Sequence, residues 1–188
     1  GLVKLQDLNL EWTRISDISP LRNMRKLKYL NLSQTAIDDL SPLTNLQQLR
    51  QLELEDLENL TDLPPLHDLD QLKSLNLHLC ENLTDINGLH GLSELEYLDL
   101  SSTEISDISP LRNMRKLKYL NLSSTAIDDL SPLTNLQQLR QLELEYLDLS
   151  NTEISDISPL RDLPRLKCLN LADCTGVTDL TPLAELSE

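Results

Sequence analysis

The chain of 188 residues contains no phenylalanine, and it has only one tryptophan and four tyrosines. A core with so few large aromatic rings must be filled by a regular arrangement of smaller branched side chains. Leucine is the obvious candidate, because it supplies roughly a quarter of all residues. This composition argues against an irregular globular core and favours a repeated architecture.

Positive charge is scarce as well. The 16 Lys and Arg residues face 31 Asp and Glu residues, which gives a net charge of −15 and argues against binding to nucleic acids or anionic membranes. No apolar run approaches the roughly 20 residues that span a bilayer. Three cysteines are an odd number for a disulfide framework, and no signal peptide is visible at Gly1. These features mildly favour the cytoplasm, and secretion from a bacterium stays open.

Leucine follows one pattern along the whole chain. The motif Leu-x-x-Leu-x-Leu can be aligned in eight successive copies, which start 22 or 23 residues apart except for one step of 27. The period of two within each motif then gives way to a period of three, which predicts a short strand, a turn and a short helical segment. The first leucines of the eight copies are Leu5, Leu27, Leu49, Leu72, Leu95, Leu117, Leu144 and Leu166.

This register is the signal of a leucine-rich repeat. Units such as "TEISDISPLRNMRKLKYLNLS" at residues 103–123 resemble the 22-residue repeats of bacterial internalin-type proteins. The resemblance implies an α/β fold, a right-handed leucine-rich-repeat solenoid of about eight coils over residues 1–188. A parallel β-sheet would line the concave face, and short 3₁₀ or α segments would line the convex face. No capping unit is recognisable at either end.

One string of fifteen residues poses a structural question. "SPLTNLQQLRQLELE" occurs at residues 41–55 and again at 131–145, and residues 15–55 match 105–145 except for Gln34 against Ser124. Recent duplication or deliberate assembly from modules would both produce this. The first copy supplies a strand. In the second copy we expect the strand at Tyr146–Ser150, with Leu139–Glu143 extending a helix from near Ser131, so that residues 117–143 form an irregular long coil.

Each unit carries its own turn and capping residues. Thr13, Thr35, Thr103, Thr125 and Thr152 stand where the family usually has Asn, whereas Cys80, Cys174 and Leu57 stand there in other units. We interpret both cysteines as core residues. The Ser-Pro pairs predict an N-cap followed by Pro at the first helical position. The Asp residues before them favour capping over a calcium ladder, and the basic residues that follow, such as Arg22, Arg25, Lys26 and Lys28, fit as solvated partners of the helix dipoles.

Side chains alternate along a strand, so three residues per coil should face outward on the concave side. All four tyrosines fall in one of these columns, and tyrosine is enriched at protein interfaces. Copying of one accidental tyrosine is the alternative explanation. The candidate partner-binding residues are Trp12, Tyr29, Asn31, Asn76, His78, Tyr97, Asp99, Tyr119, Asn121, Tyr146 and Asp148.

Catalysis is not expected, and neither is a cofactor or a metal site. His67 and His90 fall on convex loops, His78 is alone on the concave face, and no Ser/His/Asp or Cys/His set converges by register. The leading hypothesis is a recognition scaffold that binds a protein or peptide on the concave face. The alternatives are a structural solenoid that associates end to end, and the sensor fragment of a larger bacterial protein.

Overall fold

The computed structural model describes residues 4–133 and 143–187, and in these residues eight short strands form one parallel sheet in chain order. Every neighbouring pair is aligned residue for residue, so that equivalent positions of the repeat lie side by side. The strands are β1 (Asp7–Asn9), β2 (Tyr29–Asn31), β3 (Gln51–Glu53), β4 (Ser74–Asn76), β5 (Tyr97–Asp99), β6 (Tyr119–Asn121), β7 (Tyr146–Asp148) and β8 (Cys168–Asn170).

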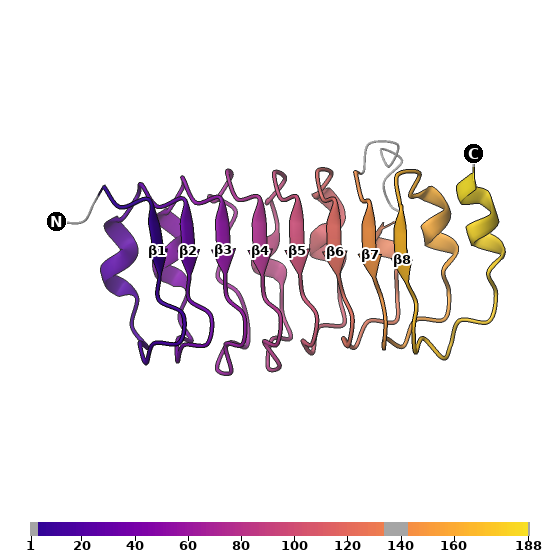
Figure 1. Cartoon of the computed structure of the whole chain (residues 1–188), viewed down its shortest axis with the longest axis horizontal. Coiled ribbons are helices and arrows are strands. Elements are labelled where there is room, and N and C mark those ends of the chain that lie inside the picture. The colour runs from indigo at the N-terminus through magenta and orange to yellow at the C-terminus, as the bar shows by residue number, and fades with distance from the viewer. Residues whose placement is uncertain (1–3, 134–142, 188) are drawn as a thin grey trace.

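Short 3₁₀ helices lie behind the sheet (Figure 1). They spread beyond the strands at both ends of the view, so the sheet lines the inner, concave side of the arc and the 3₁₀ helices the outer side. The resulting architecture is a solenoid of eight coils. The 3₁₀ helices in the described residues are η1 (Ser19–Asn23), η2 (Ser41–Asn45), η3 (Asn87–Leu89), η4 (Ser109–Asn113), η5 (Ser131–Leu133), η7 (Ser158–Asp162) and η8 (Thr181–Ser187).

The core is a stack of leucines between the sheet and the convex side. The central leucine of each inner strand, such as Leu52 or Leu98, is fully buried. Cys80 and Cys174 are also buried, as predicted, and their thiols donate to the carbonyls of Leu54 and Leu149 in the preceding coil. Burial raises the pKa of Cys80 to about 11. A repeating layer of leucine therefore replaces the aromatic residues that the sequence lacks.

The turn after each strand has the same conformation in every coil. One residue per turn adopts positive φ, and all eight are non-glycine: Trp12, Gln34, Asp56, Leu79, Ser102, Ser124, Asn151 and Asp173. Where the next residue is threonine, its hydroxyl donates to the carbonyl three residues earlier, as from Thr35 to Leu32 at 2.7 Å. Threonine therefore closes this buried turn with one hydrogen bond.

The convex segments are capped by only one of the two residue types predicted for this role. The helices begin at serine, and the N-cap positions are taken by apolar residues such as Ile18, which make no side-chain capping bond. The cap comes from the aspartate one residue earlier: Asp17 Oδ1 accepts the N–H of Ser19 at 2.8 Å. Aspartates 39, 85, 107, 129, 156 and 179 repeat this bond. The prediction of serine as N-cap was wrong, whereas the predicted capping role of the aspartates is confirmed.

The third coil departs from this scheme for a chemical reason. Asp62 is followed at the second position by Pro64, which has no N–H to donate. No 3₁₀ helix forms between β3 and β4 in the part of the chain described, and the backbone of Asp62 pairs instead with that of Asp85.

The duplicated string gives a strand in its first copy, at β3. The strand predicted near Tyr146 is confirmed as β7, which pairs directly with β6. The predicted helical extension from Leu139 falls almost entirely on residues outside the described part of the chain. None of the helices described is long and apolar enough to cross a membrane.

Candidate functional site

The concave face carries a stack of three tyrosine rings. Tyr97, Tyr119 and Tyr146 occupy equivalent positions of the neighbouring strands β5, β6 and β7. Their ring centroids are 4.3 and 4.5 Å apart, and the planes are inclined by 10° and 4°. The separation follows from the sheet, since adjacent strands lie roughly 4.8 Å apart. Tyr29 shares the column but is separated from the stack by β3 and β4. Hereafter the three rings are the tyrosine stack.

The two outer faces of the tyrosine stack are bordered by small side chains. Ser74 lies beside Tyr97 in the register, and Cys168, which is exposed, lies beside Tyr146. Neither side chain is large enough to cover a phenol ring. The stack therefore offers its two end faces as well as its edges to a partner.

The phenol groups stay protonated at neutral pH. Burial, followed by the neighbouring Tyr97 and Asp99, raises the pKa of Tyr119 to about 12. Burial and the charge of Asp148 raise the pKa of Tyr146 to about 12, and its hydroxyl donates to Asp148 Oδ2 at 3.2 Å. The hydroxyls are therefore hydrogen-bond donors at neutral pH.

The Asn and Asp column beside the tyrosines is less exposed than expected. Asn31, Asp99 and Asp148 are buried. In every coil except the third, where Glu53 takes the place, the Oδ1 atom accepts the N–H two residues later, as between Asn31 and Ser33 at 2.9 Å. The amides also reach the preceding coil, where Asn121 Nδ2 donates to Asp99 Oδ2 at 3.2 Å. Asn76 follows the same pattern. These side chains therefore stabilise the turns and the contacts between coils.

His78 is not alone, contrary to the prediction. Its Nδ1 lies 2.8 Å from Ser101 Oγ, and this hydroxyl donates to Asp99 Oδ1. A Ser/His/Asp set thus converges, but in the wrong order for nucleophilic catalysis. In a hydrolase triad the histidine lies between serine and aspartate and takes the serine proton. Here serine lies in the middle and its proton points at the carboxylate, so the chain of bonds positions His78.

The structure does not unite all the predicted site residues. His78, Asn76 and the tyrosine stack occupy neighbouring strands from β4 to β7. Trp12 follows β1 and is 76% exposed with a φ of 58°, at the far end of the sheet. Tyr29 lies in β2. Among the described residues, no three His, Cys, Asp or Glu side chains form a group suited to a metal ion.

The charge of the concave face is negative. Asp7, Glu11, Glu53, Glu55, Asp99 and Asp148 occupy its three outward columns, and neither Lys nor Arg occurs in the columns as described. This complete separation of charge was not among the features predicted from the sequence. The signal was present, because every lysine and arginine of a unit falls outside the strand and the turn that follows it.

Comparison with known proteins gives one family. A model described as "Leucine Rich repeats (2 copies)" matches residues 3–45, 93–135 and 142–185. None of the curated proteins compared matches the chain.

Two solved structures of Listeria monocytogenes are similar throughout. Internalin C2 is 36% identical, with a TM-score of 0.83 over 96% of this chain and 76% of its own. The internalin inlF is 31% identical, with a TM-score of 0.85 over 99% of this chain, which spans only 59% of inlF. The ectodomain of the Arabidopsis thaliana receptor kinase GASSHO1/SCHENGEN3, in complex with CASPARIAN STRIP INTEGRITY FACTOR 2, is 23% identical over 88% of this chain and 21% of its own, with a TM-score of 0.73.

Proposed function

The chain belongs to the leucine-rich repeat family, and from this premise we propose that it is a recognition scaffold that binds a protein or peptide on its concave face. The fold is typically a binding scaffold rather than an enzyme. The tyrosine stack is the observation that carries the proposal. Three large rings stand together on a sheet whose other outward residues, apart from Tyr29, are small or polar. Tyrosine presents contact area at a low cost in conformational entropy.

The surroundings of the stack favour a cationic partner. Asp99 and Asp148 flank the rings, and no lysine or arginine in the described concave columns would repel a positive charge. An arginine side chain can stack its guanidinium on the uncovered face of Tyr97 or Tyr146 while its N–H groups meet carboxylates. We therefore expect the partner to present arginine in an extended segment or exposed loop.

The relatives support a partner of this general kind. The plant receptor ectodomain was solved in a complex, which is an example of what the fold can bind. At 23% identity, its likeness to this chain shows a shared fold and no more. Because this chain spans only part of inlF, a larger protein that uses this segment as its sensor is compatible with the same proposal.

The test is a selection of random peptides on the full chain at moderate salt, followed by titration of the best binders. Tyr119→Ser interrupts the stack with the residue that naturally occupies the same column at position 74, so the fold should tolerate it. Arg112→Gln, on the convex side, is the control. We expect arginine-containing peptides whose Kd rises at least about tenfold in Tyr119→Ser and is unchanged in the control. Peptides that bind Tyr119→Ser as well as the unmodified chain would contradict the proposal.

A second candidate function is end-to-end self-association. It is favoured by an apolar pocket of about 410 Å³ on the first coil, lined by residues that include Leu5, Leu8, Leu10 and Met24. Light scattering over a range of concentrations tests it. A monomer at all concentrations would exclude this candidate, and a ladder of sizes that grows with concentration would support it.

A further inference from the structure

The margin of the sheet where the chain enters each strand carries most of the ion pairs. We call it the strand-entry margin and define it by the residues one and three positions before each strand. The first set is Gln6, Lys28, Arg50, Lys73, Glu96, Lys118, Glu145 and Lys167, and the second is Lys4, Lys26, Gln48, Gln71, Glu94, Lys116, Glu143 and Arg165.

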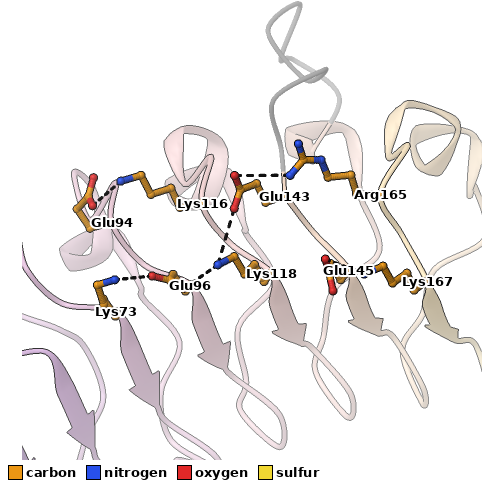
Figure 2. Close-up of polar contacts among 9 residues, drawn as sticks. All are labelled: Lys73, Glu94, Glu96, Lys116, Lys118, Glu143, Glu145, Arg165 and Lys167. Carbon is orange, nitrogen blue, oxygen red and sulfur yellow. Dashed lines mark hydrogen bonds and ion pairs between the residues drawn. The ribbon is translucent and has the colours of Figure 1, made fainter.

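In the C-terminal half of this margin, charges of opposite sign alternate from coil to coil (Figure 2). Glu96 lies between Lys73 and Lys118 at 2.7 and 2.8 Å, and hydrogen bonds from these two lysines lower its pKa to about 2. Lys167 pairs with Glu145 at 2.9 Å. Lys116 and Arg165 are paired with Glu94 and Glu143 in the same way. This half of the margin is therefore internally neutralised.

The N-terminal half has no such compensation. Lys28, Arg50 and Lys73 follow one another on adjacent coils, and only Lys73 has a carboxylate partner, on its other side. Lys28 Nζ bonds the neutral Oε1 of Gln6 at 2.8 Å. Among the described residues neither Lys28 nor Arg50 forms an ion pair. Like charges on neighbouring strands repel each other, and an anion bound between them would relieve this repulsion.

The duplication in the chain provides an internal comparison. Lys118 occupies the same place in residues 105–145 as Lys28 does in residues 15–55, and the two segments differ only at Gln34 and Ser124. Lys118 bonds Glu96 of the preceding coil at 2.8 Å, whereas Lys28 bonds Gln6. The lack of a carboxylate at Lys28 is thus a property of its neighbours and not of the repeat.

A pocket lies beside Lys28 and Arg50 on the strand-entry margin. It measures about 400 Å³ and is lined by Lys28, Gln47, Gln48, Arg50, Asp70 and Gln71. Two cations and three amides supply hydrogen-bond donors, and the amides of glutamine are neutral. Asp70 is the one carboxylate in the lining, and Gln71 Nε2 donates to its Oδ1 at 3.3 Å. The more distant carboxylates of the chain are screened over about 8 Å at physiological salt.

We propose that this pocket is an oxyanion-binding site, separate from the concave face, which takes ligands that carry two or more negative charges on phosphate or sulfate groups. Lys28 and Arg50 stand one coil apart, so two neighbouring oxyanions of one ligand can each meet a cation. The planar fork of Arg50 matches two oxygens of one such group, while Lys28 supplies a point charge. The flanking glutamines donate to the remaining oxygens.

The experiment titrates the full chain with inorganic pyrophosphate in one arm and a sulfated disaccharide in the other, by calorimetry at moderate salt. The test variant is Lys28→Gln with Arg50→Gln, because glutamine occurs naturally in this column at Gln6. The matched control is Lys116→Gln with Lys118→Gln, which removes the same charge from the copy where the lysines are already paired. Amide shifts in NMR spectra report the location of binding independently.

We expect saturable binding with a Kd below about 1 mM, weakened at least about tenfold in the test variant and by no more than about twofold in the control. Shifts should centre on residues 28, 47, 48, 50 and 71. Binding in one arm alone would assign phosphate or sulfate as the ligand group, and binding in both would assign their shared chemistry. No saturable binding in either arm, or equal weakening in the two variants, would overturn the proposal.

Discussion

Exchanging the residues at positions 34 and 124 would measure how much the buried side-chain amide of Gln34 lowers the free energy of unfolding. These positions are the single difference between the two copied segments, and their backbones are the same: both have φ of 55°, and both N–H groups donate to the next coil, at 2.8 and 2.9 Å. Ser124 Oγ accepts a bond from Asn151 at 3.1 Å. Gln34 Oε1 is buried without a hydrogen-bond partner among the described residues.

The magnitude follows from this contrast. A buried polar atom left without a partner costs about 1–3 kcal/mol. Replacing Gln34 by serine removes that cost and the entropy of ordering a long side chain, but it also loses the packing of the glutamine's methylene groups. We expect Gln34→Ser to raise the free energy of unfolding by about 1 kcal/mol, or Tm by about 2–4 °C for a chain of this size. Ser124→Gln should lower the free energy by a similar amount.

Urea unfolding of both variants gives the two free energies. Because repeat proteins can open coil by coil, hydrogen exchange at the amides of residues 34 and 124 should be followed in parallel. The free energy of unfolding should change with opposite sign in the two variants. If both exchanges destabilise the chain, the buried amide of Gln34 is satisfied in solution and the argument is refuted.

Two further predictions follow from the convex side. In Gly88→Ala the added Cβ would lie 2.4 Å from the Pro64 carbonyl oxygen and 2.5 Å from that of Leu63, so we expect a loss of about 1–3 kcal/mol in thermal melts, and an unchanged Tm would contradict the contact. The N–H and hydroxyl of Ser109 hold the pKa of Asp107 below 3.8, and Asp17, Asp39, Asp156 and Asp179 are lowered by the same kind of contact. Because these folded pKa values lie below the unfolded ones, their stabilisation is complete above pH 3.8 and is lost as the pH falls through the folded values. Urea unfolding at a series of pH values should show this decline, less steeply in Asp107→Asn, and equal declines would refute the capping role.

The strands and the core could be predicted because they depend on one simple rule. Leucine at the inner positions must be buried, and a one-residue slip would expose all of it, so the register of β1 to β8 follows from the leucines alone. The strand at Tyr146 was predictable for the same reason, since every later leucine depends on it. The buried cysteines followed from their place in the repeat.

The roles of the polar groups were harder to predict. Alternation says that Asn31 and Asp99 face outward from the strand, but it does not say that the next turn folds back and uses their oxygens. The sequence offered both the serines and the aspartates before them as caps, and it did not show that only the carboxylate, which accepts the serine N–H, would have this role. The contact of His78 with Ser101 depends on side-chain conformations in two adjacent coils. The basic residues were expected to be solvated, and the cross-coil pairs of Lys116 and Lys118 require knowing which glutamates stack beside them.

The step of 27 residues between Leu117 and Leu144 leaves the pairing of β6 with β7 in full register. The length of a coil can therefore change without altering how its strands pair in the sheet. A foreign epitope, a fluorescent label or a second binding loop could be grafted between these two strands while the rings of Tyr119 and Tyr146 keep their stacking. For the same reason, natural variants can change the residues of the concave face and the length of the connections between strands separately.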